Sequence, residues 1–280
     1  MEIIMIHSDW HIHSECSYDA TLPLETIAQN AQQMGFHFVG ITDHVNYNDE
    51  KFLGDLRNSA RCVKEMQKSY PFMVLGAELT PISKPEFDHI AKVGTRAGYI
   101  APESGEPYGI ELAVSKEELV ALGVRYAIGA SHWRVDCAKI DPFDTAACIK
   151  EWYRQQLWLA CDGRVTVLGH PWYNGHALWY DDFSVIPNSM NLDIAAALKE
   201  NGKYAEYNPH FYGVATNTSE KFRYQYAEFL RELFEMGVPI TYGSDAHGTY
   251  KEYHVRGEKY LTAAGFRDGD FSDIAESDLW

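Results

Sequence analysis

The sequence predicts an α/β fold in which seven parallel strands alternate with helices and close into a barrel. The first observation is a series of short apolar runs spread along the 280 residues. The second is that amphipathic helical segments separate several of these runs, which is typical of parallel strands joined by crossover helices. Seven candidate strands fit a closed barrel better than a small open sheet, and α/β barrels of about 250 residues commonly form one domain.

The candidate strands are short apolar runs bounded by glycines or polar residues. They lie at 3–6, 36–41, 72–77, 125–130, 165–169, 203–207 and 238–243. Four segments between them carry apolar residues at helical spacing and end at a glycine, which commonly stops a helix. These predicted helices lie at 24–35, 144–163, 194–202 and 219–237.

One segment departs from this alternation of strands and helices. Within residues 80–124, the stretch "TRAGYIAPESGEPYGIE" combines glycines and prolines without apolar periodicity. We expect an irregular loop excursion there, placed over the barrel mouth. No linker or internal repeat divides the chain, so the prediction is a single domain over residues 1–280.

The acidic balance of the chain limits its partners. Lys and Arg total 24 against 40 Asp and Glu, a formal net charge of −16, which argues against a nucleic-acid or anionic-membrane surface. No apolar run approaches the roughly 20 residues that span a bilayer, and the run at 2–6 is too short for the core of a signal peptide. The 5 cysteines are scattered without a CxxC pair, so we expect reduced thiols and a cytoplasmic protein. The composition predicts no particular oligomeric state.

Each candidate strand is followed by polar side chains that can bind a metal ion. In chain order they are Asp9, His11 and His13; Asp43 and His44; Glu78; His132; His170; Glu206 and Asn208; and Asp245 with His247. In a barrel the carboxyl ends of all strands meet on one face, where barrel enzymes hold their active sites. Alternate residues of an extended chain share a face, so His11 and His13 can bind one ion or two neighbouring ions. The spacing therefore predicts a metal centre on this face.

A single histidine after a strand is more often a buried core residue than a ligand. The closely spaced pairs at 11–13 and 245–247, together with the other strand-end ligands, favour metal binding for the group as a whole. Histidines outside this pattern are interpreted as ordinary residues: His7, His37, His89, His210 and His254. His176 stays open, because it can line the pocket or simply pack. The sequence has no GxSxG, P-loop or HExxH motif of other enzyme classes.

The order of these motifs resembles that of the PHP (polymerase and histidinol phosphatase) family. The motifs are "DWHIHSECSYDA", "ITDH", "GAE", "GASH", "GHP", "EYN" and "GSDAH", and they cover nearly the whole chain. The resemblance implies a distorted (β/α)7 TIM-like barrel that holds two or three divalent metal ions. Mixed histidine and carboxylate ligands suit Zn, Mn or Fe.

The resemblance also implies which residues are the metal ligands. They are His11, His13, Asp19, His44, Glu78, His132, His170, Asp245 and His247. Asp19 enters through the resemblance alone, because its spacing does not single it out. Family precedent divides the set among three ions: His11, His13, Glu78 and Asp245; Glu78 again with His132 and His170; and Asp19, His44 and His247.

Within the family the chain most resembles histidinol-phosphatase-type members, which act on a small phosphorylated substrate. Those phosphatases present arginines after "GH" and after "EYN", and here "GHPWYNGHAL" and "EYNPHFYGVATN" contain none. Because a bidentate arginine contributes strongly to phosphate binding, this departure argues against histidinol phosphate itself. Arg134 is the nearest basic candidate. We expect an aromatic-lined pocket formed by Trp133, Trp172, Tyr173, Trp179 and Tyr212.

The leading hypothesis is a metal-dependent phosphatase in which a hydroxide that bridges two ions attacks a phosphate monoester. Glu78 and Asp245 would hold the ions, His176 or an aspartate would protonate the leaving group, and Arg134 would meet the phosphate.

Two alternatives use the same ligands. The missing arginines keep open an amidohydrolase-like attack on a carboxylic ester, lactone or amide. A non-enzymatic metal-binding module is less favoured, because a structural zinc site is closed and four-coordinate. Under either enzymatic hypothesis, Asp9 and Asp43 are expected to orient ligand imidazoles through their free N–H groups.

Overall fold

Seven parallel strands form the central sheet of the protein. The computed structural model describes residues 6–102, 108–133, 140–173, 179–209, 218–250 and 257–280. In sheet order the strands are β1 (Ser8–Ile12), β2 (Phe38–Ile41), β4 (Met73–Leu79), β7 (Tyr126–Gly129), β8 (Val167–Leu168), β9 (Tyr204–Tyr207) and β10 (Ile240–Tyr242). A short strand, β3 (His44–Val45), pairs with the carboxyl half of β4.

The two edges of the sheet meet beyond the end of β10. Ile12 and Ala246 form a parallel bridge. The amide of Asp245 donates to the carbonyl of His11 (2.7 Å), and the amide of His13 donates to the carbonyl of Ala246 (3.1 Å). The prediction of a distorted (β/α)7 TIM-like barrel in a single domain is confirmed.

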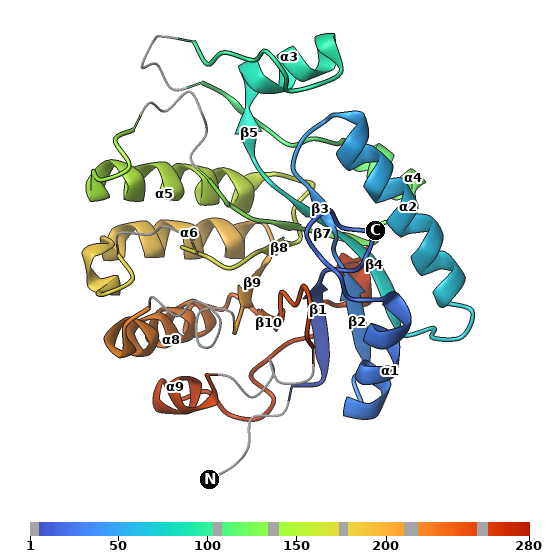
Figure 1. Ribbon diagram of the computed structural model, residues 1–280. Helices are drawn as coiled ribbons and strands as arrows, with labels where there is room; N and C mark the ends of the chain where they lie inside the picture. The colour runs from blue at the N-terminus through green and yellow to red at the C-terminus, as the bar shows by residue number, and fades with distance from the viewer. Residues whose placement is uncertain (1–5, 103–107, 134–139, 174–178, 210–217, 251–256) are drawn as a thin grey trace.

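Helices surround the strands (Figure 1). They are α1 (Leu24–Met34), α2 (Glu50–Met66), α3 (Lys84–Val93), α4 (Lys116–Ala121), α5 (Thr145–Cys161), α6 (Asn188–Glu200), α8 (Glu220–Glu235) and α9 (Glu258–Ala263), with the 3₁₀ turns η2 (Phe183–Val185) and η4 (Glu276–Asp278). Helix α8 shows why these segments are helical. The Ser219 side chain caps its first turn by accepting from the amide of Phe222, and Phe222, Tyr226 and Leu230 bury one face.

The first strand of the described residues is β1. It spans Ser8–Ile12 and is buried throughout, whereas the strand predicted at 3–6 lies almost entirely outside the described residues. The pairing of β1 with β2 shifts register between Asp9 and Ile12, as at a β-bulge. A bulge bends a strand and redirects its side chains. His11 lies within β1 and not in the loop after it.

The segment 80–124 is more regular than the excursion predicted from its composition. Strand β5 (Ile82–Ser83) pairs antiparallel with β6 (Ile110–Glu111) and ties the two ends of the segment together. The Ser83 side chain caps α3, which has a proline in its first turn. Ser115 and Glu118 form a capping box at α4. The regular elements lie on either side of the glycine- and proline-containing stretch, whose described residues 94–102 and 108–109 form no helix or strand.

The buried apolar residues form two clusters. The larger one lies among the strands and the surrounding helices. The smaller one, called here the inner cluster, comprises Trp10, Val74, Tyr126, Ile128, Val167, Tyr204 and Ile274. Most of its members are strand residues, and Ile274 comes from the carboxyl-terminal segment. That segment is held by the amide of Ser272, which donates to the carbonyl of Ile240 (2.8 Å), and by the amide of Trp280, which donates to the carbonyl of Arg125 (2.7 Å).

Two expectations from composition can be compared with the described residues. None of the helices in the described ranges is long and apolar enough to cross a bilayer. Cys16, Cys62, Cys148 and Cys161 are free thiols, as predicted. Cys137 lies outside the described residues.

Candidate metal centre

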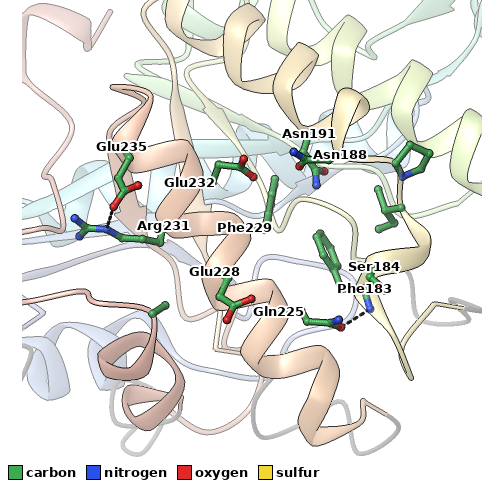
Figure 2. A pocket seen from close by; sticks show the side chains of 13 residues that line it. Phe183, Ser184, Asn188, Asn191, Gln225, Glu228, Phe229, Arg231, Glu232 and Glu235 are labelled. Carbon is green, nitrogen blue, oxygen red and sulfur yellow. Dashed lines mark hydrogen bonds and ion pairs between the residues drawn. The ribbon is translucent and has the colours of Figure 1, made fainter.

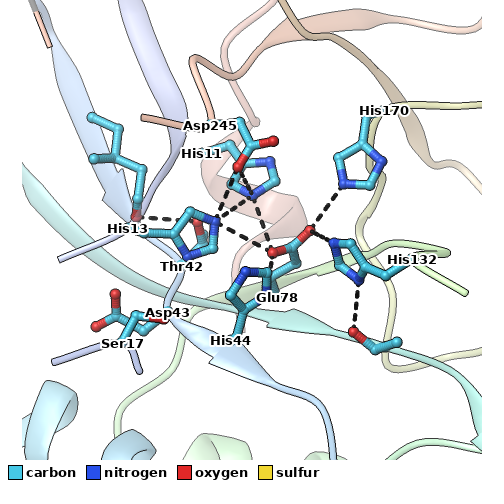
Figure 3. Close-up of polar contacts among 12 residues, drawn as sticks. His11, His13, Ser17, Thr42, Asp43, His44, Glu78, His132, His170 and Asp245 are labelled. Carbon is cyan, nitrogen blue, oxygen red and sulfur yellow. Dashed lines mark hydrogen bonds and ion pairs between the residues drawn. The ribbon is translucent and has the colours of Figure 1, made fainter. Parts of the chain in front are cut away.

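The predicted ligands converge at the carboxyl ends of the strands. His11 lies in β1, His44 in β3 and Glu78 near the end of β4, while His132, His170 and Asp245 follow β7, β8 and β10. Figure 3 shows their side chains pointing toward one another around Glu78. Residues that are far apart in the chain therefore share one buried space because each leaves a parallel strand at the same end.

The carboxylate of Glu78 is the centre of the cluster. Its Oε1 atom lies 3.2 Å from His132 Nε2 and 3.1 Å from His170 Nε2. Its Oε2 atom lies 2.7 Å from His44 Nδ1, 3.3 Å from His13 Nε2 and 3.4 Å from His11 Nε2. Five imidazoles from different parts of the barrel thus contact one side chain.

Two further carboxylates extend the cluster. Asp245 Oδ1 lies 3.2 Å from His13 Nε2 and 3.6 Å from His11 Nε2. Asp19 Oδ2 lies 3.3 Å from His44 Nε2 and 3.7 Å from His247 Nε2. The structure therefore brings together the full set of predicted ligands, including Asp19.

The backbone is strained at two of these ligands. His170 has φ of 25° and Asp245 has φ of 52°, and neither is a glycine. Such left-handed conformations cost about 1–3 kcal/mol each and persist only where the surroundings enforce them. Trp172, with φ of 62°, adds a third such residue just after β8. The strain lies where the chain turns sharply to direct ligands inward.

Mutual electrostatics shift the pKa values of the cluster. Burial lowers the pKa of His44, but the neighbouring Glu78 and Asp19 carboxylates outweigh it and raise the pKa to about 10. Burial is likewise outweighed at His11, whose pKa is well above its usual value. Burial raises the pKa of Glu78, yet the imidazoles of His44, His132 and His11 hold it well below its usual range. At His132 the effect of burial is larger than that of the Glu78 carboxylate, and the pKa is lowered. The site as a whole favours positive charge beside its carboxylates.

The donor set fits divalent metal ions. Glu78 Oε2 is buried and faces three imidazole nitrogens at 2.7–3.4 Å, but none of these contacts has hydrogen-bond geometry. Nitrogen and carboxylate donors that crowd together in this way suit coordination of a shared cation. Three sets of ligands have atoms that all lie within 4.8 Å of one another: His11, His13 and Asp245; His44, Glu78 and His132; and His13, His44 and His247. The first set falls within one predicted ion site, and the other two cross the predicted division. How many ions bind, and how they share these ligands, stays a prediction.

The comparison with known families agrees with this geometry. The PHP domain family matches residues 9–210 of the chain. This chain belongs to the PHP domain family. The match ends before Asp245 and His247, although the structure places both side chains in the ligand cluster.

A solved structure shares the fold of this PHP domain. The histidinol phosphate phosphatase of Lactococcus lactis subsp. lactis, solved with zinc, L-histidinol and phosphate, has a TM-score of 0.64 at 15% identity, with 98% of each chain covered. A structure from Agrobacterium tumefaciens has a TM-score of 0.45 at 11% identity, covering 99% of this chain and 93% of the other. No curated protein matches the sequence. The family and the ligand cluster together support a metal-dependent hydrolase.

The aspartates expected to orient ligand imidazoles instead accept hydrogen bonds from the backbone of the PHP domain. Asp9 Oδ1 accepts from the backbone amides of His11 (3.1 Å) and Ser244 (2.9 Å). Asp43 accepts from the amide and hydroxyl of Ser14 (2.6 and 2.7 Å) and from the Ser59 hydroxyl (2.7 Å). Both carboxylates therefore fix the backbone that carries the ligands. That role depends on loop geometry that spacing does not reveal.

Two other residues hold the imidazoles. Glu206 Oε1 lies 2.6 Å from His11 Nδ1. The Thr80 hydroxyl lies 2.9 Å from His132 Nδ1 and donates to Asn46 Oδ1 (2.6 Å). The strand-end motif "EYN" marks Glu206 in the sequence but not its partner. No sequence signal distinguishes Thr80 from an ordinary loop threonine.

Aromatic side chains stand beside the ligand histidines. Trp133 lies 5.7 Å from His132 and Tyr173 lies 5.1 Å from His170, measured between ring centroids. Tyr18, which the sequence does not single out, lies 5.6 Å from His44. We call Tyr18, Trp133 and Tyr173 the aromatic rim.

The expected aromatic pocket is wrong in two of its members. Trp172 and Trp179 are buried in the larger apolar cluster, where the Trp179 indole N–H donates to the carbonyl of Trp172 (3.1 Å). Large apolar surfaces near a site can serve packing alone, and here they do. Tyr212 lies outside the described residues, as do His176 and Arg134, the predicted acid and phosphate-binding candidates.

Proposed function

We propose that this PHP domain hydrolyses a phosphate monoester of a small molecule. The observation that carries the proposal is the Glu78 carboxylate, buried at the carboxyl end of the barrel and contacted by imidazoles from five positions in the chain. A structural metal site would be closed by four ligands, whereas this cluster offers more donors than one ion requires. Several ions beside one another suit phosphoryl transfer.

The residues of the cluster would act by holding the ions in fixed positions. His11, His13 and Asp245 form one face of the cluster, and Glu78 joins it to the face formed by His132 and His170. When bound, the ions would supply positive charge for the phosphate oxygens and an activated water. Zn, Mn and Fe all suit this donor set.

The aromatic rim supports a substrate with a flat, apolar part attached to the phosphate. Trp133 also stacks on Tyr47, with ring centroids 5.8 Å apart and planes 17° from parallel. This pairing fixes the indole beside His132. Stacking on such a fixed ring contributes about 0.5–1.5 kcal/mol. Replacing Trp133 by alanine should therefore raise KM for an aryl phosphate several-fold and leave KM for a short alkyl phosphate unchanged.

The relative from Lactococcus lactis supports the reaction class through the ligands in its structure, L-histidinol and phosphate. The segments after His170 and Asn208 lack arginine in this chain, so we propose a monoester other than histidinol phosphate. We also propose a cytoplasmic location, in keeping with the free thiols.

A hydrolysis panel tests the proposal. Purified protein is stripped of metal, loaded with Zn²⁺ or Mn²⁺, and assayed against phosphate monoesters, phosphate diesters, carboxylic esters, lactones and amides. Phosphate release from monoesters that depends on added metal is the expected result. Turnover confined to carboxylic esters, lactones or amides would reject the phosphatase in favour of the amidohydrolase-like alternative.

A further inference from the structure

Glu206 is a buried carboxylate in β9 that contacts the cluster without being one of the predicted ligands. Its side chain is 1% exposed, and both of its oxygens are used. Oε1 lies 2.6 Å from His11 Nδ1. Oε2 accepts from the backbone amide of His170 (2.6 Å) and from Asn208 Nδ2 (3.3 Å). One side chain therefore reaches ligands from β1 and from the turn after β8.

The contact with His11 determines which ring nitrogen faces the cluster. A carboxylate can only accept a hydrogen bond, so His11 donates from Nδ1 to Glu206. In the neutral imidazole Nε2 is then unprotonated, and it points at Glu78 and Asp245 at 3.4 and 3.6 Å. This is the tautomer that a metal ligand needs.

The contact with His170 acts on the backbone. His170 has φ of 25°, a conformation that a histidine adopts only when its surroundings hold it. The Oε2 atom of Glu206 accepts from the amide of that same residue. Asn208 extends the arrangement, because its Nδ2 also donates to Oδ2 of Asp245 (3.2 Å), the other strained ligand.

Gly243, directly after β10, leaves space for this arrangement. A Cβ atom at Gly243 would overlap Glu206 Oε1 and would lie 2.5 Å from His11 Cβ. Glycine is therefore required at position 243 for close approach, and not for a left-handed backbone. The small residue at position 243 therefore allows the Glu206 side chain to stay in contact with His11.

We propose that Glu206 is the positioning residue of the metal centre: it fixes the tautomer of His11 and the strained backbone of His170, so that metal affinity depends on a side chain that binds no metal. This inference rests on the metal centre of the proposed function. It concerns binding alone and can be tested without any substrate.

The variant Glu206→Gln tests the proposal with little change of shape. An amide has one acceptor and one donor group, so it cannot accept from both His11 and the His170 amide. One of these donors must lose its partner. Losing such a contact behind a ligand typically costs 10–100-fold in metal affinity, and we expect that fall in Zn²⁺ affinity, measured by competition with a chromophoric chelator on EDTA-stripped protein. The number of ions bound at saturation should stay the same, whereas Glu78→Gln, which removes a ligand, should reduce it.

A matched control is Glu86→Gln. Glu86 is also 1% exposed and paired, to Arg96, but it touches none of the ligands in the contacts described. Its variant should keep wild-type affinity. Equal affinity in wild type and Glu206→Gln, or an equal fall in both variants, would overturn the proposal.

A measurement on the wild-type protein covers the case in which Glu206→Gln fails to fold. In ¹⁵N-labelled, zinc-loaded protein, the imidazole proton of His11 should be found on Nδ1, with nitrogen shifts of a metal-bound Nε2. A proton on Nε2 would refute the role assigned to Glu206. Phosphatase activity enters neither measurement, so a failure here is distinct from a failure of the proposed reaction.

Discussion

The two ends of the barrel interior differ in how their buried polar atoms are satisfied. At the inner cluster the Tyr126 hydroxyl donates to the carbonyl of Trp10 (2.5 Å), and the Tyr204 hydroxyl donates to Asp278 (2.7 Å). At the metal centre, Glu78 Oε2 is surrounded by the imidazoles of His44, His13 and His11, but none of these contacts has hydrogen-bond geometry. The polar atoms of one end pair within the fold, whereas those of the other end are arranged as ligands around a shared ion.

The inner cluster therefore serves mainly the stability of the fold, and the metal centre serves function. Apolar burial at the inner cluster stabilises the fold by roughly 25 cal/mol per Å². The carboxylates and imidazoles of the metal centre are held close together at the expense of stability, since each must be desolvated. Changes at the two ends should therefore have separable effects.

The largest effect is expected from Glu78→Gln. The substitution keeps the size of the side chain but removes the charge that the imidazoles surround. Metal ions contribute several kcal/mol to stabilising transition-state charge, so kcat/KM should fall by about a thousandfold or more. Urea unfolding of the metal-free variant should show no comparable loss. A variant that retains wild-type turnover would contradict the assignment of the active site to this end.

The second prediction concerns the other end of the barrel. Tyr126→Ala removes a fully buried ring from the inner cluster and should cost about 3–5 kcal/mol of unfolding free energy. Tyr126→Phe removes only the hydroxyl and should cost about 1 kcal/mol. Zinc stoichiometry, measured below the unfolding transition, should be unchanged in both. Loss of zinc from a folded Tyr126→Phe variant would show that the two ends are not separable.

The third prediction concerns the contribution of bound metal to stability. A ligand present at 100 times its Kd stabilises the folded state by about 2.7 kcal/mol. For a protein of this size, removal of metal with EDTA should then lower Tm by about 5 °C or more. The shift should reverse on adding Zn²⁺ and should be smaller in Glu78→Gln, which is expected to bind fewer ions. A Tm that is indifferent to EDTA in the wild type would contradict a metal requirement at this end.

The smallest effect is expected where the carboxyl-terminal segment meets the inner cluster. Asp278→Asn weakens the hydrogen bond from the Tyr204 hydroxyl and should cost about 1 kcal/mol in urea unfolding. Glu276→Gln is a suitable control, because its ion pair with Arg125 is exposed and such pairs contribute little. Equal stability of the two variants would mean that the segment does not hold the cluster.

The sequence predicts the metal end far better than the inner cluster. Ligands such as His132 and His170 follow short apolar runs, and in a parallel barrel such positions must converge. The carboxyl-terminal segment has no apolar periodicity, so the place of Ile274 beneath the strands could not be foreseen. The strand at Ser8–Ile12 is buried at every position although it carries polar residues, so apolar runs alone do not reveal it.

The supporting contacts are predictable only in part. Glu206 stands in a recognisable motif, but its partner His11 is distant in sequence and becomes its neighbour only when the barrel closes. The roles of Asp9 and Asp43 depend on which backbone amides face them, and local spacing carries no information on that. The sequence predicts which residues are ligands, whereas the orientation of their side chains depends on contacts that form only when the barrel closes.

The bridge between Ile12 and Ala246 has a consequence for how the protein matures. His11 and His13 are made early in synthesis and Asp245 late, yet these three form one ligand set. Chains emerge and fold from the amino terminus, so this set cannot capture an ion until the last strand has closed the barrel. Loading of this set would then report that the barrel has closed, and a truncated chain that lacks Asp245 could not complete it.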